Sequence, residues 1–184
     1  MKIPKYKGNP QLVALWQNKL MRMIEEKSLE FDIDISMLGG KITWCPYNPD
    51  YRPIIRISDD YLDTGTLNGV MAVLHELGHY VDIRKNDYDP VYIFGVMGNL
   101  HFEISAWEHA FKLARKIGFN EFDTLRDDAL FCLRTYYDKP HLWEKLDRDY
   151  GFKGEHPSWE EATERINQAH KQAVKAYKSA LLRV

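Results

Sequence analysis

Apolar residues recur with a helical period in most segments of this 184-residue chain. Asn9 and Pro10 suit an N-cap and a first helical position, so we expect an amphipathic helix from there to about Lys27. Its apolar positions, which we expect to face the core, are Leu12, Leu15, Trp16, Leu20, Met23 and Ile24.

Two short runs rich in β-branched and aromatic residues, 41–47 and 53–58, are separated by an Asn-Pro-Asp turn and predict two antiparallel strands. A run at 91–94 could form a further strand or an apolar wall. Helices are expected at 99–118, at about 124–137 and 141–149, and after a capping box that begins at Ser158. The pattern predicts one α+β domain over residues 1–184, mainly helical, with a small antiparallel sheet.

Residues 75–79 read His75-Glu76-Leu77-Gly78-His79, an HExxH motif that follows an apolar run. On a helix the two histidines lie one turn apart on the same face, where two imidazoles can bind one metal ion. Two imidazoles and a third protein ligand are typical of catalytic zinc, which keeps one position open for water. Glu76 would then accept a proton from that water. Gly78 costs about 1 kcal/mol relative to alanine inside a helix, which suggests that another backbone approaches there.

The third ligand is expected on the helix at 99–118, which has an N-cap candidate in Asn99 and a C′ glycine in Gly118. A carboxylate on a buried face is costly unless it is paired or binds metal, which favours Glu103 and leaves Glu108 as a solvated charge. Alternatives are His101, His109 and, behind them, Asp82, which could instead orient an imidazole or lie at a helix end. The apolar face that holds Glu103 consists of Ala106, Trp107, Ala110, Ala114 and Ile117.

These residues carry a family resemblance over about residues 53–118. The HExxH motif, followed 24 residues later by Glu103-Ile104-Ser105-Ala106, resembles the small gluzincin metallopeptidases, nearest to the ImmA/IrrE-type proteins of phages and mobile elements. The resemblance implies a zincin-like fold, zinc bound by His75, His79 and Glu103, Glu76 as general base, and a protein partner such as a transcriptional repressor. The chain departs from thermolysin-type gluzincins at Trp107, where those enzymes have an aspartate.

Composition and charge narrow the function classes. The chain is 45% hydrophobic and 13% aromatic, which argues against disorder, and its net charge of −2 offers no general attraction to nucleic acid or anionic membranes. Cys45 and Cys132 form no CxxC pair and are expected to be reduced core thiols. With no membrane-spanning run in the sequence, we expect a cytoplasmic protein.

The sequence therefore predicts a zinc peptidase that hydrolyses a protein or peptide substrate bound in extended form. We expect the strand at 53–58 to be an exposed edge to which this substrate adds. An alternative is a zinc-containing module that sequesters a regulatory partner without hydrolysis, and another is a metal that only staples helices together. The candidates for an oxyanion-stabilising residue, among which the sequence does not choose, are Tyr136, Tyr137, His141, Tyr150 and His156.

Overall fold

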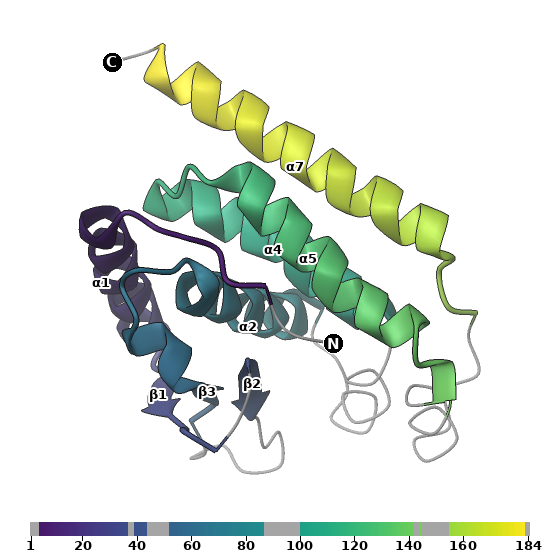
Figure 1. The fold of residues 1–184 in the computed structure, drawn as a ribbon, viewed down its shortest axis with the longest axis horizontal. Coiled ribbons are helices and arrows are strands. Elements are labelled where there is room, and N and C mark those ends of the chain that lie inside the picture. The colour runs from purple at the N-terminus through teal and green to yellow at the C-terminus, as the bar shows by residue number, and fades with distance from the viewer. Residues whose placement is uncertain are drawn as a thin grey trace.

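The fold is mainly helical α+β with one small sheet, seen in a computed structural model that describes residues 4–36, 39–43, 52–86, 100–141, 144 and 155–182 (Figure 1). The predicted fold class is confirmed. The elements in chain order are α1 (Pro10–Glu26), β1 (Glu30–Ile33), β2 (Gly40–Thr43), β3 (Ile54–Ile57), the 3-10 helix η1 (Asp59–Leu62), α2 (Asn68–Asn86), α4 (Leu100–Ile117), α5 (Phe122–Tyr137) and α7 (Trp159–Leu181).

The sheet is mixed rather than purely antiparallel, with the strand order β1-β3-β2. The predicted antiparallel pair is present as β2 and β3, with Lys41 opposite Arg56. The pattern did not predict β1, which pairs with β3 in parallel, with Asp32 opposite Arg56. Because β3 has a neighbour on both sides, the expectation that the strand at 53–58 is an exposed edge is wrong. In the described part of the sheet, β2 and β1 are the edges.

Helix α1 begins as predicted, since the Asn9 side chain accepts hydrogen bonds from the backbone N–H groups of Gln11 and Leu12. The apolar stripe is rotated from the expected one: Leu12 and Leu15 are 37% and 47% exposed, whereas Val13 is buried. The reason is that α1 packs against α2 and α4 over a narrow seam. The buried residues on this seam are Val13, Trp16, Leu20 and Ile24.

Helices α2 and α4 form the centre of the molecule and are in close contact. A Cβ atom at Gly78 would overlap the carbonyl oxygen of Ala106 and lie 2.8 Å from its carbonyl carbon, so the predicted backbone approach at Gly78 is confirmed. Helix α4 is buried on more sides than expected, because α5 and α7 cover it as well. It ends at Gly118, which has a positive φ of 74°.

Helix α7 opens with the predicted capping box, in which Ser158 and Glu161 satisfy each other's backbone N–H groups. Glu108 of α4 was expected to be solvated, but its two carboxylate oxygens lie 2.8 and 2.9 Å from the Arg165 guanidinium of α7. This bidentate pair joins the two helices. The predictions for 91–94, Cys45, Tyr150 and nearly all of the helix at 141–149 lie outside the described residues. Within the described ranges, no helix has both the length and the apolarity needed to cross a membrane.

Candidate metal centre

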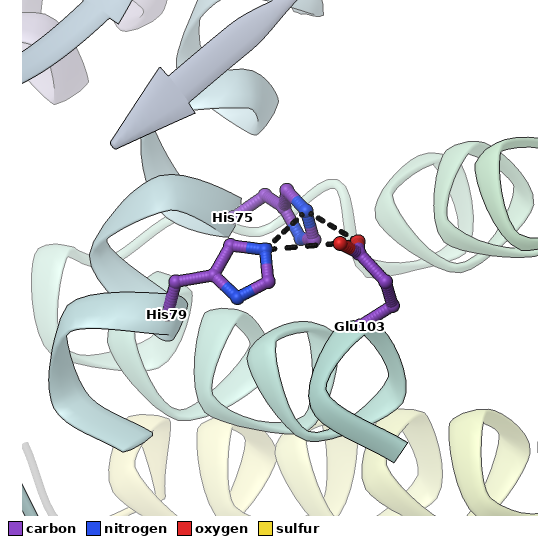
Figure 2. Close-up of side chains that lie close together, drawn as sticks. All are labelled: His75, His79 and Glu103. Carbon is purple, nitrogen blue, oxygen red and sulfur yellow. Dashed lines mark hydrogen bonds and ion pairs between the residues drawn. The ribbon is translucent and has the colours of Figure 1, made fainter. Parts of the chain in front are cut away.

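Three potential ligands from two helices converge at one point in the molecule (Figure 2). His75 and His79 come from successive turns of α2, and Glu103 comes from the first turn of α4. The two histidine Nε2 atoms lie 3.0 Å apart, and Glu103 Oε2 lies 3.2 Å from His75 Nε2 and 3.6 Å from His79 Nε2. The structure thus brings together the three residues that the sequence singled out.

These separations fit a shared metal ion. Ligand atoms at about 2.0–2.2 Å from a tetrahedral ion lie roughly 3.3 Å apart, close to the three distances observed here. All three side chains are largely buried, with exposures of 14%, 7% and 13% for His75, His79 and Glu103. Burial alone would raise the pKa of Glu103, but the adjacent His79 and His75 outweigh it and hold that pKa below its ordinary value. The site therefore stabilises the carboxylate form that binds metal.

Glu76 faces the same site without being one of the three ligands. It follows His75 on α2, is 5% exposed, and accepts a hydrogen bond from the backbone N–H of Ile42 in β2. A Cβ atom at Gly40 would lie only 2.9 Å from the Glu76 carboxylate, so the glycine leaves room for it. Burial raises the pKa of Glu76 to about 7, which is the range in which a carboxylate is an effective proton acceptor near neutral pH.

Aromatic rings enclose the two histidines. The Trp107 ring, one turn after Glu103 on α4, stacks on His75 with ring centroids 4.3 Å apart, and Phe102 lies 4.4 Å from the His79 ring. Trp107 therefore contributes a ring that packs against the His75 imidazole.

The alternative third ligands lie elsewhere. His101 is exposed, and its Nε2 lies 3.0 Å from the Glu155 carbonyl oxygen. His109 is buried with its Nε2 3.6 Å from Asp82, which also accepts a hydrogen bond from Ser105. Asp82 therefore orients an imidazole, as one interpretation of the sequence proposed, but the imidazole is that of His109. The sequence offered His109 only as an alternative metal ligand and did not predict its pairing with Asp82.

A cleft of about 490 Å³ opens onto these residues. One wall is β2 with the start of α2, and the opposite wall is α5, which contributes one helical face. Among the candidates for an oxyanion-stabilising residue, Tyr136 lines this cleft and donates a hydrogen bond to Glu103. The Tyr137 hydroxyl instead donates to the Pro157 carbonyl oxygen. The α5 face consists of Asp128, Phe131, Cys132, Thr135 and Tyr136.

Two side chains on this α5 face, Tyr136 and Cys132, have raised pKa values. The negative charge of Glu103, together with burial, raises the pKa of Tyr136, which keeps its hydroxyl a hydrogen-bond donor. Burial likewise raises the pKa of the Cys132 thiol, so the thiol stays protonated, as expected for an unreactive cysteine. The sequence did not single out Asp128, because nothing in its local pattern distinguishes it from the aspartate beside it.

Comparisons with protein-family models, with curated proteins and with solved structures find no match for this chain.

Proposed function

We propose that this protein is a zinc-dependent peptidase in which Glu76 is the general base. The observation that carries the proposal is the position of Glu76, a buried carboxylate beside the His75, His79 and Glu103 group but not part of it. A metal that only joined two helices would need neither this carboxylate nor an open cleft next to it.

Zinc is the ion that this donor set suits best. Two imidazole nitrogens and one carboxylate oxygen are typical of catalytic zinc sites, which keep a further position open. When bound, zinc supplies Lewis acidity that lowers the pKa of water and polarises a peptide carbonyl.

The side chains of the cleft divide the remaining work. Glu76, held by the Ile42 N–H, would accept a proton from the attacking water and later deliver it to the leaving amine. The Tyr136 hydroxyl donates to Glu103 here, and we propose that during the reaction it turns to donate to the oxyanion that develops on the substrate carbonyl. Glu76 belongs to α2 with the two histidines and is oriented by β2, whereas Tyr136 belongs to α5.

The substrate would be a protein or peptide segment bound in extended form along β2. This strand lines the cleft, and in the described sheet it is paired on one side only. Ser58 N–H donates to the Gly39 carbonyl, so in the antiparallel register the backbone groups of Gly40 and Ile42 point away from β3. Those groups are available to an added strand, apart from the Ile42 N–H that bonds Glu76.

The test combines metal analysis with one conservative substitution. We expect about one zinc ion per chain, with severe loss of affinity in His79→Ala and in Glu103→Ala. Glu76→Gln should keep the fold and the zinc, while hydrolysis of a proteome-derived peptide library falls by roughly 10² or more because glutamine cannot accept the proton. The matched control is Glu164→Gln, the same change on the exposed face of α7.

Three outcomes would contradict the proposal. Full zinc occupancy in both ligand variants would refute the assignment of the metal ligands. Unchanged turnover in Glu76→Gln would refute the role of Glu76 as the general base. If the wild type cleaves no library peptide but binds a protein partner tightly, the sequestering function takes the place of the peptidase.

A further inference from the structure

Asp128 is a buried carboxyl group that the proposed chemistry does not use. It is 7% exposed, lies on α5 and lines the cleft. No hydrogen bond or ion pair of its side chain is found among the described residues, and the one described side chain that favours its ionised form is His75. A buried carboxylate without a partner is costly, so its presence in a cleft calls for a ligand that compensates it.

The charges around the cleft leave Asp128 uncompensated. The other two buried carboxyl groups at the cleft have partners of their own, since Glu103 lies against His75 and His79 and Glu76 accepts a hydrogen bond from the Ile42 N–H. Asp60, also at the cleft, already has Lys5 at 3.6 Å. Asp128 therefore has no ion-pair partner among the described residues that would compensate its ionised form.

The nearby lysine of β2 does not supply the missing charge. Lys41 is exposed and lies opposite Arg56 in the sheet, so the two side chains share one face. Arg56 pairs with Asp32 on that face, whereas the neighbouring Ile42 is buried on the other. The Lys41 side chain is thus directed to the face of the sheet away from the core.

Asp128 and Tyr136 stand at different points along the α5 wall of the cleft. Tyr136, which bonds Glu103, lies eight residues further along the helix, a rise of about 12 Å. The pKa of Tyr6 is raised first by burial and then by the negative charge of Asp128, so the two side chains are near each other. The Tyr6 N–H donates a hydrogen bond to the Asn68 side chain at the start of α2. Asp128 therefore stands at the end of the cleft near the start of α2. An extended peptide whose cleaved bond lies at the metal would reach Asp128 within a few residues.

A role in holding His75 is not supported by the geometry. The His75 Nδ1 atom is buried and has no hydrogen-bond partner in the described part of the chain, so Asp128 does not bond it. The carboxyl group instead faces the space that a substrate would fill.

We propose that Asp128 forms a subsite for a positively charged group of the substrate, an ammonium or guanidinium group near the cleaved bond. This inference rests on the proposed peptidase function and specifies its substrate class. The charged group has two sources: a lysine or arginine side chain, or the free amino terminus of a short peptide. Burial raises the pKa of Asp128 to about 7, and a cation bound beside it would restore its ionised form.

The test measures binding, so that it does not depend on hydrolysis. Zinc-loaded Glu76→Gln protein is titrated with dye-labelled, acetylated octapeptides in which one lysine is moved through the positions, each matched with a norleucine peptide. A second panel has free amino termini and no lysine. We expect one lysine position, or the free amino terminus, to bind about tenfold or more tightly than its uncharged match, as a charge-assisted hydrogen bond predicts.

Substitutions on α5 test whether the preference for a charged peptide depends on Asp128. Asp128→Asn keeps the shape of the side chain and should abolish the preference, whereas Asp128→Glu should retain part of it. Asp127→Asn is the matched control, since it makes the same change at the exposed neighbouring residue and should leave the preference intact. Zinc content and unfolding temperature show that each variant is folded.

The outcomes separate the two proposals. Two results would overturn the subsite. One is a preference for the cation that persists in Asp128→Asn, whatever the zinc content of that variant, and the other is the absence of any preference in the protein with Asp128. A preference that depends on Asp128 supports the subsite even where the wild type fails to hydrolyse the same peptides, an outcome that would count against the peptidase alone.

Discussion

At the scale of single residues, the buried carboxyl groups of this protein fall into two kinds. Glu103 lies against two imidazoles, and Asp82 accepts a hydrogen bond from Ser105 beside His109; the pKa of each is lowered. Glu76 and Asp128 face the cleft, and burial raises the pKa of each to about 7. Glu103 lines the same cleft, so the two kinds differ in their partners: the lowered pKa values belong to the carboxyl groups beside imidazoles.

The raised pKa of Asp128 predicts a pH-dependent stability. The folded state holds the Asp128 proton up to about pH 7, whereas the unfolded chain releases it near the ordinary value of 3.8. Wild-type protein should therefore lose stability relative to Asp128→Asn as the pH rises from about 4 to 7, by about 1 kcal/mol or more. Urea unfolding of metal-free protein at several pH values measures this difference.

The control for this measurement is Asp127→Asn, whose stability should follow that of the wild type across the same pH range. A difference between wild type and Asp128→Asn that stays constant with pH would show that Asp128 carries the same charge in the folded and unfolded states.

At the scale of elements, the metal site depends on how closely α2 and α4 approach each other. His75 and His79 belong to one helix and Glu103 to the other, and Gly78 lies between the two histidines. The backbone of α4 at Ala106 occupies the space that a side chain at Gly78 would need. The same glycine that weakens the helix locally brings the third ligand within reach.

Replacing Gly78 should therefore damage both the fold and the metal site. In an open helix, Gly→Ala stabilises by about 1 kcal/mol. Here we expect Gly78→Ala to destabilise by about 1–3 kcal/mol, because the added Cβ overlaps the Ala106 carbonyl and forces the helices apart. Zinc affinity should fall as well. Thermal unfolding and a zinc-chelator competition measure the two effects, and a stabilised variant with unchanged zinc affinity would contradict the packing argument.

At the scale of the whole molecule, the cleft is assembled from elements distant in sequence. Strand β2 and helix α5 form opposite walls, and α2 and α4 carry the ligands between them. Helix α7 lies across α4 and α5 on the side away from the sheet, and its Arg165 is paired with Glu108 of α4 (Figure 1). The helical layer therefore holds the α5 wall in place, while β2 lies at the edge of the sheet in the described part of the chain.

This arrangement predicts an alternating pattern of substrate contacts. A peptide added to β2 would use every second backbone N–H, so N-methylation at alternate positions should weaken binding about fivefold each, in line with a hydrogen bond of about 1 kcal/mol. Methylation at the intervening positions is the matched control and should have little effect. Titration of zinc-loaded Glu76→Gln protein with the methylated series provides the measurement, and a uniform response along the peptide would exclude docking on this strand.

The sequence by itself determined the features that depend on residues close together in the chain. The side chains of Asn9 and Ser158 cap their helices through bonds that span only a few residues. His75 and His79 share a face because the helical period places them there, and the same period selected Glu103 from its apolar face. These predictions required only local geometry and the cost of burying a charge.

Only the tertiary structure decided which distant elements meet. The parallel pairing of β1 with β3 made β3 a central strand and left β2 as the edge beside the cleft, although β2 and β3 have similar local patterns. His109 is buried against Asp82 because α7 and α2 cover two faces of the same helix. Asp128 reaches the cleft because α5 packs there. Such contacts depend on the packing of surfaces far apart in the chain, which no local pattern of apolar and polar residues records.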